Sequence, residues 1–411
     1  MRRVALTGIG AVSPLGVGWQ DHWGAWLTGP PRFSRITRFD ASAYPCQVAG
    51  QVDDASYEAL IDPRKARTTS HATRLALAAA QLALNDARLP ERCYPAYDFG
   101  VAVGTSLGGW ADGEKQIGIM LERGARRANP FLLSGSGPYG PGVEIASAFG
   151  AQGQHLTVSC GCPSSLLAIG QAVSLIASGA LEVCLAGGTE SPLTPMTFAA
   201  LCRTHELSGE LGDPAQASRP FDRRHSGIVL SEGSCFLVLE SLEAAKQRGA
   251  SIYAELSGCV SSCDAQGMYT LDASGEAGAR ALHRLLRQCD LDVSGVDYVC
   301  ANANSSAAFD RKETIVLQKA FGEFAARMAV SSIKGVQGHP SGASGAFQVA
   351  ASALSILHRM IPPTHNLEEA DPECELNHVP GEGRAADVRR ALVTSYGYGG
   401  LNSYLLVSQT T

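Results

Sequence analysis

The chain has 411 residues, of which 45% are hydrophobic and 18% are charged, and its net charge is −6. This length exceeds what one hydrophobic core usually fills, so two core units are expected. The acidic balance argues against a general nucleic-acid binder, because such a protein needs a basic surface to neutralise phosphates.

The sequence indicates neither a secreted nor a membrane protein. The start, MRRVALTGIGAVSPLG, is interrupted by glycines and lacks a small-residue cleavage site, so it predicts a first strand and not a signal peptide. The uncharged stretch 156–181 could span a bilayer by length, but its small polar residues and Gln171 favour a buried strand and helix. The twelve cysteines lack the spacing of a disulfide framework or a zinc site, which favours a reducing cytoplasm and no metal.

Short β-rich runs alternate with helical segments along the whole chain, which is typical of an α/β architecture with buried sheets. Strands are expected within 2–10, 99–109, 155–160, 182–190, 233–242, 251–262, 297–306, 327–335 and 391–408. Helices are expected at 74–89, 163–181, 276–289 and 344–359.

Two strand segments of the chain resemble each other and indicate two halves. VALTGIGAVS opens the first half and AELSGCVSSC opens the second, and each runs from a strand into glycine and small residues. We therefore expect an N-terminal half over residues 1–250 and a C-terminal half over residues 251–411. No low-complexity linker separates them, so they are expected to pack as one rigid body.

A cysteine stands where a predicted strand meets a predicted helix. In TVSCGCPSSLLAIGQA, residues 157–172, Pro163 suits the first helical position because its missing N–H costs nothing there. Cys162 then faces the positive end of the helix dipole, which is expected to lower the pKa of its thiol and stabilise the reactive thiolate. Cys160 is expected inside the strand as a packing residue, without a helix end to activate it.

This segment resembles the active-site segment of the β-ketoacyl-acyl-carrier-protein synthases, the ketosynthases of the thiolase superfamily, in their fatty-acid elongation and type II polyketide branch. The resemblance continues in order through RRVALTGIGAVSPLG, GVAVGTSLGG, RPFDRRHSGIVLSEGS, DRKET, SSIKGVQGHPSGASGA, IPPTHNLEEADPECELNHVP and SYGYGGLNSYLLV. It implies a thiolase-like fold with a duplicated αβαβα five-layered architecture, a dimer, and Cys162 as the cysteine that accepts the acyl group.

The resemblance also implies a decarboxylative Claisen condensation with a malonyl thioester, for which the family supplies two histidines as hydrogen-bond donors. His339 in KGVQGHPSGASG matches the second histidine. Lys334 matches the family lysine that orders charges and hydrogen bonds around the site. The chain is expected to need no cofactor of its own, since the phosphopantetheine arm belongs to the acyl carrier protein.

The first family histidine is missing. In DYVCANANSSAAFDRKET, Asn302 stands in its place, while Asp310 and Glu313 still match the family's downstream acidic pair. An amide can donate a hydrogen bond to an oxyanion, but it cannot shuttle a proton. The sister branch that primes fatty-acid synthesis uses one Cys, one His and one Asn, with the Asn at the other position. We therefore expect Cys162, Asn302 and His339 to form a swapped set that condenses but decarboxylates in an altered or impaired way.

A glycine-rich loop, TSYGYGGLNS, matches the family loop near the C-terminus, with Tyr396 and Tyr398 where Phe is usual. The resemblance implies that the backbone N–H groups of Cys162 and Tyr398 form the oxyanion hole, and that the Tyr398 ring is a gate beside the cysteine. Ile228 and Ser231 also replace the usual Phe and Gly, which leaves the acyl substrate open.

Acyl carrier proteins are acidic, so a locally basic surface would steer one to the site in spite of the negative net charge. Basic residues in PRKAR, RGARR and LCRTHE roughly match the family's carrier-docking positions; they are Arg64, Lys65, Arg67, Arg123, Arg126, Arg127 and Arg203.

Three functions fit this sequence. A ketosynthase that extends carrier-bound chains with malonyl units, as a homodimer or as a heterodimer with a chain-length-factor-like chain, is favoured by Cys162. A chain-length-factor-like partner subunit is favoured by Asn302 but usually lacks the cysteine. A non-condensing acyltransferase would keep Cys162 and tolerate the loss of a histidine.

Overall fold

The computed structural model describes residues 2–90 and 93–410. One half of its main sheet comes from the first part of the chain and is ordered β1-β8-β7-β5-β6. The bounds of these strands are β1 Val4–Ser13, β5 Phe99–Gly104, β6 His155–Val158, β7 Val183–Glu190 and β8 Gly233–Ser241. A short strand, β2 (Gly16–Val17), pairs with the end of β1.

The second part of the chain repeats this strand order in β9-β16-β15-β10-β11, with β13 added at the far edge. The bounds are β9 Ala254–Cys263, β10 Tyr298–Cys300, β11 Ala329–Ser331, β13 Asn377–His378, β15 Arg390–Gly397 and β16 Leu401–Ser408. The two halves join where β1 and β9 pair antiparallel over two residues, Ala5 with Glu255 and Leu6 with Ala254.

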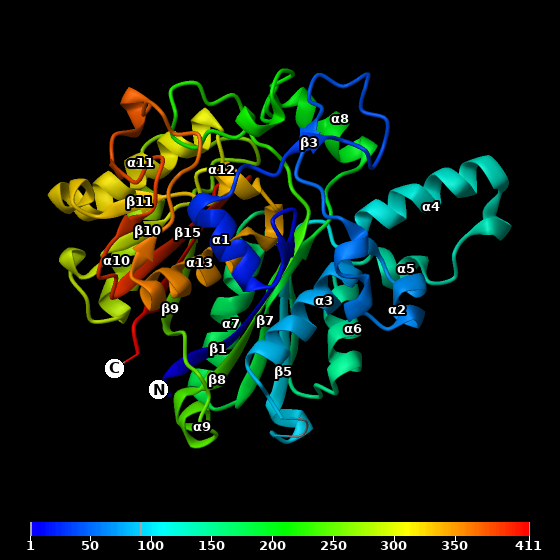
Figure 1. Ribbon diagram of the computed structural model, residues 1–411, viewed down its shortest axis with the longest axis horizontal. Coiled ribbons are helices and arrows are strands. Elements are labelled where there is room, and N and C mark those ends of the chain that lie inside the picture. Colours follow the sequence, from blue (N-terminus) through cyan, green and yellow to red (C-terminus); the bar gives the residue numbers. More distant parts are fainter. Residues whose placement is uncertain (1, 91–92, 411) are drawn as a thin grey trace.

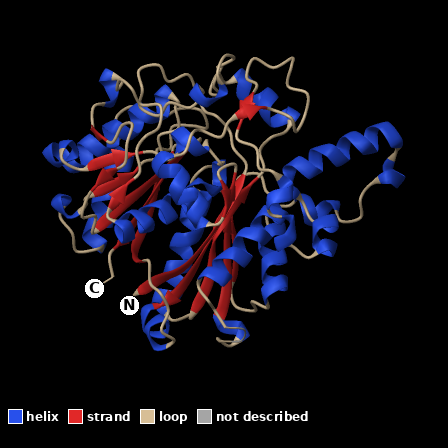
Figure 2. Cartoon of the chain, in the orientation of Figure 1, coloured by secondary structure: helices blue, strands red, loops and turns tan. Residues whose placement is uncertain are grey.

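Two central helices lie between the two halves of the sheet. Helix α7 (Ser164–Ser178) contacts β5 and β7 on one side and β9 and β16 on the other, and α13 (Ser344–His358) contacts β15 as well as β7 and β8. Helix α3 (His71–Asp86) covers the outer face of the first half, while α10 (Glu276–Gln288), backed by α11 (Ala307–Phe321), covers the second. The resulting five layers, visible in Figures 1 and 2, confirm the predicted thiolase-like α/β fold.

The remaining elements surround this core. Helix α4 (Trp110–Arg123) projects from the body as an arm (Figure 1), and it is followed by α5 (Leu132–Ser136) and α6 (Gly140–Phe149). The others are α1 Trp19–Thr28, α2 Pro63–Thr68, α8 Pro195–Arg203, α9 Leu242–Gln247, α12 Lys334–Gln337, β3 Ser34–Arg35, β4 Val48–Ala49, β12 Met360–Ile361 and β14 Arg384–Ala385. None of the helices in the described chain has both the length and the apolar character that crossing a bilayer requires.

Small residues allow the layers to pack closely. The outer helix α3 lies so near β1 that a Cβ built on Gly10 would come within 2.0 Å of the Ala79 carbonyl oxygen and 2.3 Å of the Ala83 nitrogen. Because both atoms belong to the backbone, no side-chain rotation can relieve the clash. The alanine-rich face of α3 and the glycines of β1 are therefore matched surfaces.

We predict that Gly10→Ala lowers the free energy of unfolding by about 3 kcal/mol or more, because it overpacks this contact. Gly118→Ala on α4 is the matched control: a Cβ there meets nothing within 4 Å, and alanine favours a helix over glycine by about 1 kcal/mol. Urea unfolding of both variants measures the difference. Equal stability of Gly10→Ala and the wild type would contradict the close packing.

Candidate active site

Cys162 lies in a sharp turn between β6 and α7. Strand β6 ends at Val158, and Gly161 adopts a left-handed conformation with φ of +61°. The backbone N–H of Cys160 donates to the Ser164 hydroxyl at 2.9 Å, so Cys160 belongs to the turn. The prediction that Cys160 lies inside the strand is wrong, because the chain already turns toward the helix there.

Pro163 caps helix α7 instead of forming its first residue, so the predicted helix start is one residue early. Cys162 consequently precedes the cap. It is partly exposed, while the helix behind it is packed between the two halves of the sheet.

The structure brings Cys162 and His339 together from the two halves of the chain. The Cys162 sulfur lies 3.1 Å from Nε2 of His339. The backbone of His339 is fixed on both sides: its N–H donates to the Val229 carbonyl at 2.8 Å, and its carbonyl accepts from the Ser231 N–H at 3.1 Å. A thiol and an imidazole at this distance can exchange a proton.

Burial sets the protonation of this pair. Desolvation raises the pKa of the Cys162 thiol to about 11, and the nearby positive charge of Lys334 only partly opposes it. The expectation of a lowered thiol pKa is therefore wrong, because the cost of burying a thiolate exceeds the help from the helix end. Burial, together with Lys334, holds the pKa of His339 well below its usual value, so its imidazole is neutral.

Lys334 is buried, with 2% of its surface exposed, and does not lie on the surface. Its ammonium group donates to the Asn302 carbonyl at 2.5 Å and to Oε1 of Gln348 at 3.4 Å. Burial lowers the pKa of Lys334 to about 8, against the pull of Glu313. Burial also raises the pKa of Glu313 to about 7, so both groups titrate close to physiological pH.

Asn302 is positioned through its backbone. Its N–H donates to Glu313 at 3.0 Å and to the Thr394 hydroxyl at 2.9 Å, and its carbonyl accepts from Lys334. The side-chain amide is fully buried, yet among the described residues neither its oxygen nor its nitrogen has a hydrogen-bond partner. Leaving such a group unpaired costs about 1–3 kcal/mol, so the amide has hydrogen-bonding capacity that no described residue uses.

The glycine-rich loop lies against the cysteine turn. A Cβ built on Gly397 would be 2.8 Å from the Pro163 ring and 3.4 Å from the Cys162 nitrogen. Gly399 and Gly400 both have positive φ, which lets β15 turn into β16 within three residues. The Tyr398 ring that follows Gly397 packs edge-on against the rings of Tyr269 and Phe309, at 6.1 and 5.6 Å between centroids.

Several buried groups around the pair escaped the sequence reasoning. The Ser344 hydroxyl lies 3.0 Å from Nδ1 of His339, on the side away from the thiol. Glu190 accepts from the N–H groups of Ser106 at 2.7 Å and Gly342 at 3.0 Å, and so ties the GTSLGG loop to the start of α13. The serines of GHPSGASG were the available signal, but small residues near a helix start usually serve packing alone.

The docking candidates lie on separate surface elements. Arg64, Lys65 and Arg67 belong to α2, whereas Arg126 and Arg127 form the turn that ends the projecting α4 arm. Arg203, at the end of α8, is exposed as well. Lys65 pairs with Glu144 at 2.5 Å, so its charge is partly neutralised.

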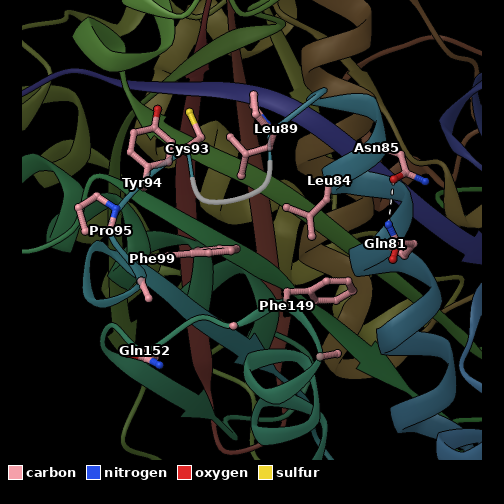
Figure 3. A pocket seen from close by; sticks show the side chains of 14 residues that line it. Gln81, Leu84, Asn85, Leu89, Cys93, Tyr94, Pro95, Phe99, Phe149 and Gln152 are labelled. Atoms are coloured by element: carbon pink, nitrogen blue, oxygen red, sulfur yellow. Dashed lines mark hydrogen bonds between the residues drawn. The ribbon is translucent and has the colours of Figure 1, made fainter.

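A hollow of about 1030 Å³ opens elsewhere, at the ends of α3 and α6 beside β5 (Figure 3). In this hollow, Gln81 donates to Asn85 at 2.8 Å, and the rings of Phe99 and Phe149 form part of the lining. It contains none of the candidate residues. In the described chain, no group of three His, Cys, Asp or Glu side chains could hold a metal ion.

Comparison with known proteins identifies the class to which this fold and site belong. The β-ketoacyl synthase N-terminal domain matches residues 1–245, and the β-ketoacyl synthase C-terminal domain matches residues 253–368. The chain belongs to the β-ketoacyl synthase family.

Curated relatives cover almost the whole chain. The 3-oxoacyl-[acyl-carrier-protein] synthase 2 of Synechocystis is 37% identical over 98% of this chain and 96% of its own length. The tetracenomycin polyketide synthase ketoacyl synthase alpha subunit of Streptomyces glaucescens is 36% identical over 99% and 97%. The predicted family and the predicted enzyme class, a ketosynthase, are thereby confirmed.

Solved structures agree over the full length of both chains. A type II polyketide ketosynthase, solved with its acyl carrier protein and bound to a hexaketide, superposes with a TM-score of 0.90 at 31% identity. The ishigamide ketosynthase/chain length factor superposes with a TM-score of 0.92 at 29% identity.

We predict that iodoacetamide alkylates Cys162 faster as the pH rises from 8 to 10, by up to about tenfold per unit and without a plateau, because the thiolate is the reactive form and the route assisted by neutral His339 does not change with pH. Peptide mass spectrometry measures the rate at Cys162, with the exposed Cys263 in the same sample as the reference thiol. A rate that does not rise between pH 8 and 10 would mean that the thiolate already exists near neutral pH and would contradict the raised pKa.

Proposed function

We propose that this protein is a β-ketoacyl-acyl-carrier-protein synthase that joins a Cys162-bound acyl chain to a malonyl unit in type II polyketide or fatty-acid biosynthesis. The single observation that carries the proposal is the 3.1 Å contact between the Cys162 sulfur and Nε2 of His339. This contact gives a nucleophile and a base in one buried site.

In the first half-reaction, Nε2 of His339 takes the thiol proton as the sulfur attacks the carrier thioester. A C–S bond forms to Cys162, the bond to the carrier sulfur breaks, and that sulfur leaves with a proton. The oxyanion of the intermediate would be held by the N–H groups of Cys162 and Tyr398, and the close approach of Gly397, the residue before Tyr398, to the Cys162 nitrogen supports this.

In the second half-reaction, a malonyl thioester loses CO2 and its electrons pass to the thioester oxygen as an enolate. His339 and Asn302 would donate hydrogen bonds to that oxygen, and the unpaired buried amide of Asn302 supports this role. The enolate carbon then attacks the acyl carbonyl on Cys162, the C–S bond breaks, and the sulfur that leaves as a thiolate takes up a proton from solvent to restore the resting thiol. Lys334 would hold Asn302 in place through its carbonyl and stabilise negative charge in the site.

A non-condensing acyltransferase is the second candidate, and Asn302 is the observation that favours it. An amide donates a hydrogen bond but cannot become charged or pass on a proton, so it stabilises an enolate less flexibly than a histidine does. A chain-length-factor-like subunit that catalyses no reaction is disfavoured, because the contact between Cys162 and His339 is intact.

We propose an acyl carrier protein as the partner, because the structurally similar type II ketosynthase was solved with its carrier protein. The basic residues of α2, of the turn after α4 and of the α8 end would steer the acidic carrier, with its phosphopantetheine arm reaching Cys162. No metal or cofactor of the chain's own is invoked for the reaction.

We propose a dimer with a second ketosynthase-like chain, either identical or related to a chain-length factor. Strand β6 is the outermost strand of its half of the sheet, and an unpaired edge strand invites pairing with another chain. Helix α6 contacts β6, and apolar side chains on α4 and α5, which precede α6, face solvent, including Leu121 at 83% and Leu133 at 81% exposure. The ishigamide ketosynthase/chain length factor supports the heterodimeric form.

We also propose that the protein is cytoplasmic. We propose further that it is built from two halves, residues 1–250 and 251–411. All twelve cysteines are free, which fits a reducing compartment. The repeated strand order on either side of the β1–β9 junction supports a boundary near residue 250.

We predict that an acyl carrier thioester acylates Cys162. Cys162→Ser should lower the acylation rate at least about a thousandfold, because the hydroxyl is a much weaker nucleophile, whereas Cys160→Ser should leave it within about twofold. Intact-protein and peptide mass spectrometry locate the adduct. An adduct on another cysteine, or on none, would overturn the proposed function.

We predict that Asn302→Leu lowers decarboxylation of malonyl-carrier protein by about a hundredfold, because the enolate loses a hydrogen-bond donor, while acylation of Cys162 continues. Release of labelled CO2 measures decarboxylation, and the acylation assay is the control. If the wild type acylates fully but releases no CO2, the acyltransferase is the correct function. Asn302→His should then restore release.

A further inference from the structure

One side chain bridges the thiol and a buried hydroxyl. Nε2 of His339 lies 3.1 Å from the Cys162 sulfur, and Nδ1 of the same ring lies 3.0 Å from Oγ of Ser344. Ser344 is the first residue of the central helix α13, and 1% of its surface is exposed. The imidazole therefore contacts one group at each nitrogen, and water does not compete for the hydroxyl.

The neutral state of the His339 imidazole makes the Ser344 hydroxyl important. Because His339 is neutral, its ring carries one N–H and one lone pair, and the two can exchange places between Nδ1 and Nε2. A serine hydroxyl rotates, so it can accept from an N–H at Nδ1 or donate to a lone pair there. Ser344 thus satisfies both tautomers, which a backbone N–H or carbonyl at the same place could not do.

The two half-reactions need opposite tautomers. To take the thiol proton of Cys162, Nε2 must carry the lone pair, so Nδ1–H donates to Ser344. To donate a hydrogen bond to the malonyl thioester oxygen, Nε2 must carry the proton, so Nδ1 accepts from the Ser344 hydroxyl. Asn302 cannot take the thiol proton in place of His339, because an amide does not exchange protons near neutral pH.

We propose that Ser344 is a positioning residue that supports both tautomers of His339 and so lets this histidine serve both half-reactions. The inference rests on the proposed function, since it assigns the proton movements of that reaction. Its physical core, the hydroxyl that supports His339 as a base for Cys162, can be tested on the protein without any carrier.

Few other titratable groups face this pair. Lys334 of α12 acts on both the thiol and the imidazole, Glu190 of β7 acts on the thiol, and Tyr398 of the glycine-rich loop lies near the thiol. Glu190 is already engaged by backbone N–H groups. Among the described residues, Ser344 is the hydrogen-bond partner recorded at Nδ1.

The test is Ser344→Ala, which keeps the Cβ and favours the helix. A buried N–H without a partner is rarer and less tolerated than an unpaired lone pair, so the ring should keep its proton on Nε2 and stop acting as a base. We expect alkylation of Cys162 by iodoacetamide at pH 8 to slow about tenfold, which corresponds to about 1.4 kcal/mol. A merely structural loosening would expose the thiol and accelerate the reaction.

Two variants complete the comparison. Ser344→Thr keeps the hydroxyl and should react within about twofold of the wild type. Ser355→Ala changes another buried serine of α13, whose hydroxyl donates to the Ala351 carbonyl at 2.8 Å, and it should also react like the wild type. An unchanged or faster rate in Ser344→Ala, or an equal slowing in either control, would overturn the inference.

Acyl loading from octanoyl-carrier protein separates the two proposals. If the wild type loads and Ser344→Ala loads about tenfold more slowly, both proposals are supported. If the wild type does not load, the proposed function fails, while the alkylation rates still report on Ser344 and His339.

Discussion

The site depends on the contact between one sulfur and one imidazole nitrogen that come from opposite halves of the chain. Cys162 precedes α7 and His339 precedes α13, and these two helices pack side by side between the sheets. A Cβ on Gly345 would come within 2.7 Å of the Leu166 Cβ, and the N–H of Ala346 donates to the Ser165 hydroxyl at 3.1 Å. The close approach of the two helix starts thus fixes the distance between nucleophile and base.

Burial is the second constraint, and it dominates the electrostatics. The same packing that aligns the pair removes water from it, so desolvation raises the pKa of the thiol and lowers the pKa of the imidazole. A helix end offers about half a unit charge, which is too little to offset the loss of solvation in a buried position. The resting site is therefore a neutral thiol beside a neutral imidazole, and in the proposed reaction proton transfer accompanies attack on the substrate.

Asn302 stands where the resemblance places a histidine, and its backbone is firmly held. Its backbone is held by Glu313, Thr394 and Lys334, so the frame for a side chain at this position is intact. Compared with the histidine that the resemblance implies at this position, the Asn302 amide only donates or accepts hydrogen bonds and does not exchange protons. The proton transfers of the proposed reaction therefore fall to His339, which is why the Ser344 hydroxyl beside it is proposed to matter.

The sequence by itself determined the strand and helix alternation and the family, and it singled out Cys162, Asn302, Lys334 and His339 as candidates, because these are written in local patterns of hydrophobicity and in ordered motifs. It missed the exact end of β6 and the direction of the thiol pKa, and it gave no reason to single out Ser344 among the serines of GHPSGASG. Only the tertiary structure decided these points. Desolvation and side-chain partners depend on which segments pack together, and these segments lie far apart in the sequence.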